Sequence, residues 1–111
     1  MLKKLHDSIQ VLEWDESITI KNVEVFRQEL NNLLNKEEKK LILNLGQTNY
    51  INSAGLGVIA ESVIQARKNE KELVILTNQQ SIKEIFSIVK FSTFMKIVDT
   101  EAVAIEFLKA E

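Results

Sequence analysis

The sequence predicts an α/β fold: a single mixed β-sheet of about four to five strands, mostly parallel, with about four helices packed on it. Short apolar runs rich in Ile, Leu and Val alternate along the chain with segments whose apolar residues recur at helical spacing. Strands that alternate with helices favour parallel pairing through right-handed crossovers. The length of 111 residues, with no linker-like stretch, indicates one domain over residues 1–111.

The first half of the chain contains two predicted strands on either side of one helix. Residues 8–14 have apolar side chains on both faces and predict a strand, and residues 18–20 predict a short extended piece. Asn22 is a residue type suited to an N-cap. The helix that follows keeps one apolar face, formed by Val23, Phe26, Leu30 and Leu33. Residues 41–45, LILNL, predict a short buried strand.

The second half repeats this alternation and ends in a helix. The apolar stripe of the next helix consists of Leu56, Ile59, Ala60, Val63 and Ile64. Residues 72–77 predict another buried strand, and Ser81 is the expected cap of the helix after it. A short edge strand is expected at 96–98, and Asp99 or Thr100 is expected to cap the last helix.

The composition excludes several classes of function. The formal net charge of −2, with lysines interleaved with glutamates, provides no basic stripe for nucleic acid. No apolar run approaches the roughly 20 residues of a membrane span, and the start of the chain lacks the apolar core of a signal peptide. The chain has no cysteine, which excludes disulfides and fits a reducing compartment. We expect a cytoplasmic protein that neither binds nucleic acid nor inserts into membranes.

The residue pattern also speaks against catalysis. The one histidine, His6, is expected to be solvated, and nothing in the spacing places it beside Ser53 in a Ser-His-Asp arrangement. The pattern contains no paired acids and no metal-ligand cluster, and residues 55–57, Gly-Leu-Gly, lack the length and the lysine of a phosphate-binding loop. A small hydrolase or nucleotide binder would need a pocket with convergent polar groups. We therefore expect no enzyme, no cofactor and no metal.

Residues 52–57, Asn-Ser-Ala-Gly-Leu-Gly, form the most informative stretch. A glycine inside a helix costs about 0.8–1 kcal/mol relative to alanine. Two glycines in the first turns therefore indicate close packing, a surface left bare for a partner, or both. Ser53 is expected either as the N-cap or as the first helical residue behind Asn52. A phosphate on Ser53 would add a charge of about −1.5 to −2 at the positive end of the helix dipole. The fold should tolerate that charge, whereas a partner packed on it should not.

The segment LILNLGQTNYINSAGLGVIAESV resembles the signature of STAS domains, especially those of bacterial anti-sigma factor antagonists. The resemblance covers nearly the whole chain and implies partner switching. In that mechanism, the unphosphorylated antagonist binds an anti-sigma factor that is also a GHKL-type serine kinase. The kinase inactivates the antagonist by phosphorylation, and a serine phosphatase restores it. The resemblance makes Ser53 the phosphoacceptor and implies a partner-binding set of Thr19, Asn52, Ser53, Ala54, Gly55, Leu56 and Gly57.

Two positions depart from the pattern of that family. Asn52 stands where the family has an aspartate, and residues 16–19, Glu-Ser-Ile-Thr, lack both the glycine and the acid of the family motif after the early strand. In the family, those acids often help to contact the kinase. The first strand of the family is expected at Leu2–Leu5 in a reduced form. An alternative is a non-switching STAS subunit of an ABC lipid-transport complex or of a stressosome-like scaffold, in which Ser53 is only a cap.

Overall fold

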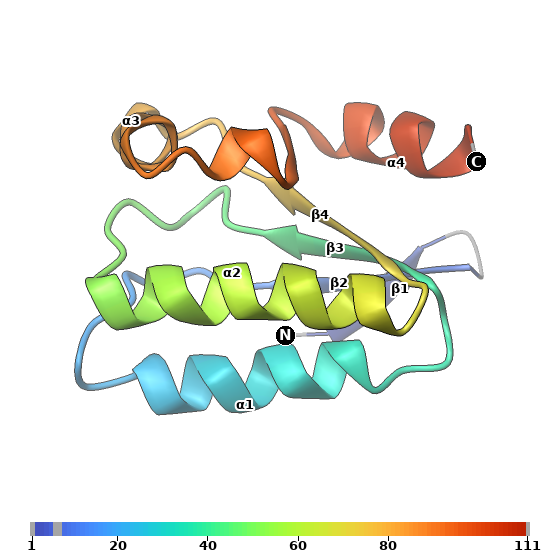
Figure 1. Ribbon diagram of the computed structural model, residues 1–111, viewed down its shortest axis with the longest axis horizontal. Coiled ribbons are helices and arrows are strands. Elements are labelled where there is room, and N and C mark those ends of the chain that lie inside the picture. Colours follow the sequence, from blue (N-terminus) through green and yellow to red (C-terminus); the bar gives the residue numbers. More distant parts are fainter. Residues whose placement is uncertain (1, 6–7, 111) are drawn as a thin grey trace.

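The computed structural model describes residues 2–5 and 8–110, and a five-stranded sheet lies at its centre (Figure 1). The strands lie side by side in sequence order; β1 is antiparallel to β2, and all other neighbours are parallel. The predicted α/β fold and the reduced first strand are confirmed. The strands are β1 (Leu2–Leu5), β2 (Ile9–Glu13), β3 (Lys40–Asn44), β4 (Glu72–Leu76) and β5 (Lys96–Val98).

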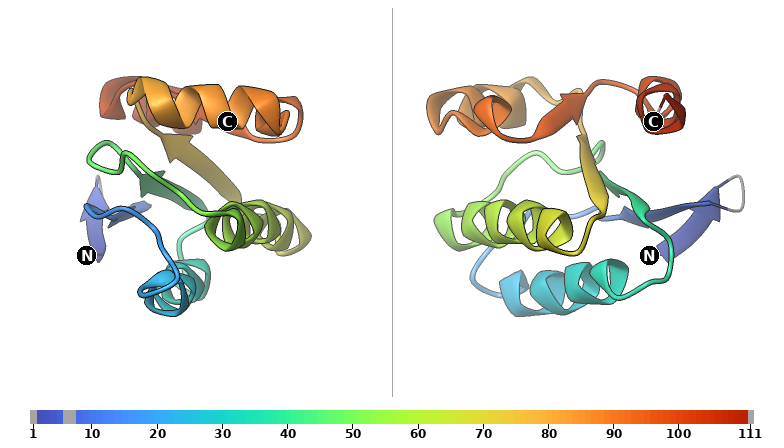
Figure 2. Two further views of the ribbon diagram at one scale, coloured as in Figure 1. Left: turned by 90° about the vertical axis from the view of Figure 1, so that its left-hand side faces the viewer. Right: turned by 45° about the vertical axis from the view of Figure 1, so that its right-hand side comes forward.

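Helices cover both faces of the sheet. Helices α1 and α2 lie side by side on one face, and α4 lies on the other (Figure 2). None of the described helices is both long enough and apolar enough to cross a membrane. The helical elements of the described residues are α1 (Val23–Leu34), α2 (Ser53–Lys68), α3 (Gln80–Ile88), the 3-10 turn η1 (Phe91–Thr93) and α4 (Glu101–Lys109).

The alternation of side chains along the strands divides the core into two clusters. Leu41 and Leu43 of β3 point into the larger cluster, together with Phe26 of α1 and Ile59 of α2. Ile42, between them, points into the smaller cluster beneath α4. The central strands are therefore buried on both faces, which explains their continuous apolar runs.

The buried stripe of α2 differs from the predicted one. Ile64 is 47% exposed, and Leu56 and Ala60 are only partly buried. Ile59 and Val63 are buried as predicted, but the small residues Gly55, Ser62 and Ala66 are buried with them and allow the helix backbone to approach its neighbours closely. Its buried residues are Gly55, Val58, Ile59, Ser62, Val63 and Ala66.

The predicted caps have three different outcomes. Thr100 caps α4 through its side chain, as expected. Ser81 is not a cap, because α3 begins one residue before it; its hydroxyl instead donates to the Asn49 carbonyl at 3.0 Å. Asn22 does precede α1, but its Oδ1 accepts from the Thr19 N–H at 2.8 Å rather than from a helix N–H. Both side chains therefore stabilise the loops that precede the helices.

Candidate docking site at the start of α2

Two loops meet at the end of the molecule where the parallel strands finish. Ile18, in the loop after β2, forms an isolated parallel bridge with Ile51, in the loop after β3. The Ile18 N–H donates to the Tyr50 carbonyl at 2.8 Å, and the Asn52 N–H donates to the Ile18 carbonyl at 3.0 Å. Both loops lie at the left-hand end of Figure 1, where α2 begins. The bridge therefore brings Thr19 beside Asn52, although the two residues are far apart in sequence.

Asn52 is the N-cap of α2, and Ser53 is its first residue. The Oδ1 atom of Asn52 accepts from the Gly55 N–H at 2.7 Å. Ser53 is exposed, and its hydroxyl has no hydrogen-bond partner within residues 2–5 and 8–110. Because Asn52 already caps the helix, capping does not explain the serine.

The two glycines of α2 have different surroundings. A Cβ on Gly55 would lie 2.7 Å from Cγ2 of Ile18 and 2.8 Å from Cγ2 of Ile51, so close packing requires glycine at this position. A Cβ on Gly57 would meet no other atom within 4 Å. Of the two explanations that the sequence left open, close packing therefore accounts for Gly55, which is buried. Gly57 is exposed, and packing does not require it to be glycine.

The seven predicted partner-binding residues differ in their burial. Ser53 and its neighbours on the outer side of the helix form the exposed part, which we call the outer face: Ser53, Ala54 and Gly57. The half-buried residues are Thr19, Asn52 and Leu56, and Gly55 is buried beneath them. The outer face therefore contains three of the seven predicted residues.

Side chains from distant elements hold the loop that leads to Ser53. The buried Thr48 hydroxyl donates to the Trp14 carbonyl at 3.0 Å, and Nε2 of Gln79 donates to the Gly46 carbonyl at 2.7 Å. The bond from Ser81 to this loop, described above, is a third support. Sequence reasoning missed all three contacts, because they join residues that no local pattern connects. The loop is therefore positioned before any partner binds.

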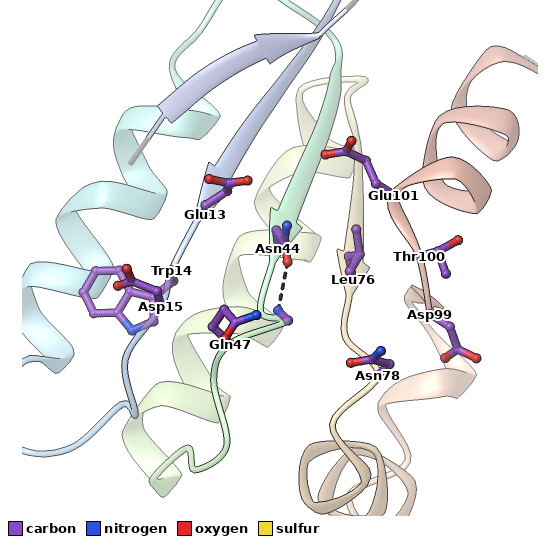
Figure 3. A pocket seen from close by; sticks show the side chains of 11 residues that line it. Glu13, Trp14, Asp15, Asn44, Gln47, Leu76, Asn78, Asp99, Thr100 and Glu101 are labelled. Carbon is purple, nitrogen blue, oxygen red and sulfur yellow. Dashed lines mark hydrogen bonds between the residues drawn. The ribbon is translucent and has the colours of Figure 1, made fainter.

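An open hollow of about 660 Å³ lies at the same end of the strands, in front of β2, β3 and β4 (Figure 3). Ser53 does not line it. In the part of the chain that the structure describes, no group of three or more Asp, Glu or His residues could hold a metal ion. His6 lies outside the described residues. The hollow is lined by several polar side chains, including Glu13, Asp15, Asn44, Asn78, Asp99 and Glu101.

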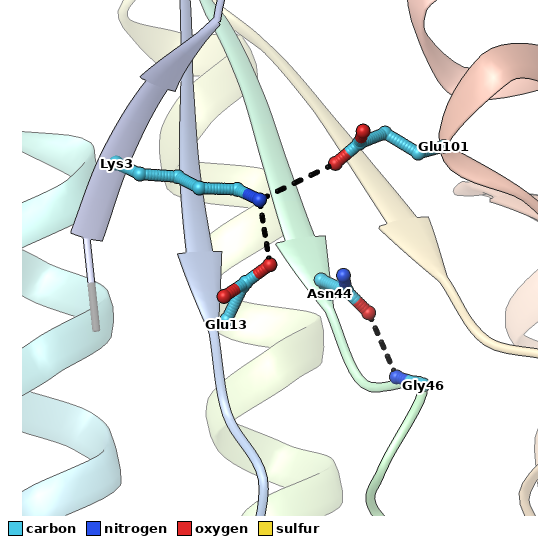
Figure 4. Close-up of polar contacts among 5 residues, drawn as sticks. All are labelled: Lys3, Glu13, Asn44, Gly46 and Glu101. Carbon is cyan, nitrogen blue, oxygen red and sulfur yellow. Dashed lines mark hydrogen bonds and ion pairs between the residues drawn. The ribbon is translucent and has the colours of Figure 1, made fainter.

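Lysines neutralise part of the acidic lining of this hollow. The Lys3 ammonium lies 2.8 Å from Oε2 of Glu13 and 3.7 Å from Oε2 of Glu101 (Figure 4). The hydrogen bond to Glu13 raises the pKa of Lys3. Lys83 makes a similar pair with Asp99 at 3.0 Å. These carboxylates face lysines rather than the Ser53 hydroxyl, so the hollow and the outer face are separate features.

Comparisons with known proteins agree with the fold and with the motif. The STAS domain model matches residues 1–104, and this chain belongs to the STAS domain family. BtrV of Bordetella bronchiseptica, described as a candidate anti-sigma factor antagonist, is 33% identical over 90 residues, which are 80% of this chain and 78% of BtrV. The resemblance to STAS domains of anti-sigma factor antagonists is thereby confirmed.

Solved structures share the architecture. The crystal structure of a candidate anti-sigma factor antagonist from Thermotoga maritima has a TM-score of 0.89 and 23% identity, and the match covers 98% of this chain and 93% of that one. The anti-sigma factor antagonist SpoIIAA in its unphosphorylated form has a TM-score of 0.74 and 15% identity, with 100% and 98% coverage. SpoIIAA of Bacillus in its phosphorylated form gives 0.71 and 16%, with 96% coverage of both chains.

Proposed function

We propose that this protein is a cytoplasmic anti-sigma factor antagonist whose association with its partner is switched off by phosphorylation of Ser53. It acts as a binding module rather than as a catalyst. The observation that carries the proposal is the position of Ser53: exposed, first in α2, and relieved of capping by Asn52. The similarity to BtrV and the solved phosphorylated form of SpoIIAA support the same mechanism.

The start of α2 suits a phosphorylated serine. Residues 50–57 contain no charged side chain, so a new dianion would meet no carboxylate within this stretch. The N–H groups of the first helical turn and the helix dipole stabilise an anion at this position by about 0.3–1 kcal/mol. We therefore expect phosphorylation to leave the fold intact.

The same charge would oppose the binding of a partner. Phosphorylation changes the outer face from neutral to about −1.5 to −2. A partner packed over Ser53 would have to remove that charge from water, which costs several kcal/mol unless a matching cation is present. Phosphorylation would therefore release the partner without changing the structure of the antagonist.

The partner in this proposal is an anti-sigma factor that is also a GHKL-type serine kinase. In the transfer, the Ser53 hydroxyl oxygen bonds to the γ-phosphorus of ATP, the bond from that phosphorus to ADP breaks, and the hydroxyl proton passes to a base of the kinase. A serine phosphatase would reverse the modification by hydrolysis. Thr19 and Asn52, which stand at the acidic positions of the family, would border the contact without adding charge.

Incubation with the cognate GHKL-type anti-sigma factor kinase, together with magnesium and ATP, tests the proposal. Mass spectrometry should find a single phosphate on Ser53 in the wild type and none on Ser53→Ala. Because the substituted side chain is exposed, the variant should fold like the wild type. Phosphate at another residue, or no phosphate from a kinase that binds the protein, would refute the switch.

A further inference from the structure

Ile20 has the most exposed large apolar side chain of the described residues, at 88%. It lies in the loop after β2, directly after Thr19. A single exposed isoleucine is not unusual on a protein surface. Its significance comes from the rigidity of the loop and from its position relative to Ser53.

Hydrogen bonds fix the backbone on both sides of Ile20. The Thr19 N–H donates to Oδ1 of Asn22 at 2.8 Å, and the Lys21 N–H donates to the Thr19 hydroxyl at 3.1 Å. Nδ2 of Asn22 also donates to the Ser17 carbonyl at 2.8 Å. The side chain is therefore held outward by an ordered turn, so a partner that buries it loses little conformational entropy.

The same turn is joined to the phosphoacceptor through the backbone. Ile18 and Ile51 are parallel bridge partners, and Ile20 and Ser53 follow them by the same number of residues. The bridge is parallel, and the loops that contain it lie at the end of the molecule where α2 begins (Figure 1). The bridged residues lie about 5 Å apart, and Ile20 and Ser53 are each at most about 7 Å of chain beyond the bridged residue of their own segment, so both fall within one interface of ordinary size.

Neutral side chains lie at the centre of this surface, and charged ones lie at its border. Residues 50–57 contain no charged side chain, and Tyr50, half exposed, adds a second large side chain beside Ile18. At the border, Oε1 of Glu16 accepts from Nδ2 of Asn22 at 3.2 Å, and Lys21 follows Ile20. A partner that covers Ile20 and the outer face would therefore meet neutral side chains at the centre of the contact and charged ones only at its rim.

We propose that Ile20 is the apolar anchor through which the partner kinase recognises the unphosphorylated protein, and that this recognition is apolar rather than ionic. The inference rests on the proposed function and adds the chemistry of its interface. An apolar partner face also makes the switch more effective, because it offers a phosphate on Ser53 no compensating cation.

Calorimetric titration of the protein with the cognate GHKL-type anti-sigma factor kinase, with ADP bound, tests the anchor directly. Ile20→Ala should weaken binding by roughly tenfold and Ile20→Asp by roughly a hundredfold, the range expected for a buried aliphatic side chain. Ile88, which is 77% exposed at the end of α3, provides the matched control. Ile88→Ala and Ile88→Asp should bind within about twofold of the wild type.

Salt provides the second arm of the test. Raising sodium chloride from about 50 to about 500 mM should change the affinity of the wild type by less than about threefold, because few exposed charges cross the interface. Equal binding of Ile20→Asp and the wild type, equal losses at Ile20 and Ile88, or a steep fall with salt would overturn the assignment. Thermal unfolding should show all four variants folded, since both side chains are exposed.

Phosphorylation of Ser53 by the same kinase, measured in parallel, separates the two proposals. If the kinase binds but leaves Ser53 unmodified, the switch is refuted. The losses of affinity in the Ile20 and Ile88 variants then still show whether Ile20 is the anchor. If Ser53 is modified normally and Ile20→Asp binds like the wild type, only the anchor is refuted. If the kinase does not bind the wild type at all, both proposals are contradicted.

Discussion

The first turns of α2 have an inner side that is tightly packed and an outer side that is exposed. On the inner side, Gly55 lies so close to Ile18 and Ile51 that no side chain fits, and Asn52 caps the helix beside it. On the outer side, Ser53 and Gly57 are exposed. A Cβ at Gly57 would touch nothing within 4 Å. Packing therefore explains the inner residues and leaves the outer ones to be explained by interactions with other molecules.

The largest effect should come from a charge on the outer face. Ser53→Asp should weaken binding of the partner kinase by roughly a hundredfold, because an unpaired carboxylate would be buried in the interface. Ser53→Ala should bind within about threefold of the wild type, and calorimetric titration of both variants measures the difference. Similar affinities for the two variants would favour a non-switching STAS subunit, of an ABC lipid-transport or stressosome-like complex, in place of an antagonist.

The next largest effect should come from the inner glycine. Gly55→Ala should lower the free energy of unfolding by roughly 1–2 kcal/mol. The new methyl group would overpack against Ile18 and Ile51, which costs up to about 3 kcal/mol. The gain in helix propensity of about 1 kcal/mol offsets only part of this cost. Urea unfolding at equilibrium measures the change. An increase in stability would show that the contact beneath α2 relaxes without strain.

The cap on the inner side should contribute less. Asn52→Ala should cost about 1 kcal/mol of stability, because the Gly55 N–H loses the acceptor that it now has at 2.7 Å. Asn52→Asp is the matched control, since it keeps an acceptor and adds a favourable charge near the helix start. Its stability should equal or exceed that of the wild type in the same urea experiment. A loss in Asn52→Asp as large as in Asn52→Ala would exclude capping as the role of this side chain.

The smallest effect should come from the outer glycine, with the opposite sign. Gly57→Ala should raise the free energy of unfolding by about 0.8–1 kcal/mol, since the new methyl group meets open space and alanine favours the helix. Urea unfolding of Gly55→Ala and Gly57→Ala under identical conditions compares the inner and outer sides of α2 directly. If both variants were destabilised to the same degree, the contrast between the two sides would be refuted.

Local signals in the sequence were sufficient for the order of the elements from β2 onward and for the start of α2, whereas β1 was expected only from the family resemblance. Alternating and helical periodicities predicted the strands and helices, and the run Asn52-Ser53 indicated the helix start. The resemblance to the STAS signature then selected Ser53 from among the exposed hydroxyls. None of these inferences required contacts between distant residues.

Tertiary contacts determined what the sequence could not show. The reason for Gly55 lies in two isoleucines from different loops, and the role of Ser81 lies in a carbonyl at Asn49. Within the predicted stripe of α2, Ile59 and Val63 are buried, whereas Ile64 is half exposed; Gly55, Ser62 and Ala66, which the prediction left out, are buried instead. Spacing along one helix cannot reveal how closely a neighbouring backbone approaches it.

The affinity of the partner kinase for the protein quantitatively phosphorylated on Ser53, compared with the unphosphorylated form, tests the central claim most directly. Both forms should unfold at similar temperatures, because the outer face does not contribute to the core. Binding of the phosphorylated form should be weaker by at least about a hundredfold, as expected for an unpaired dianion in a closed interface. Equal affinities of two fully folded forms would contradict the claim that the outer face controls association through its charge.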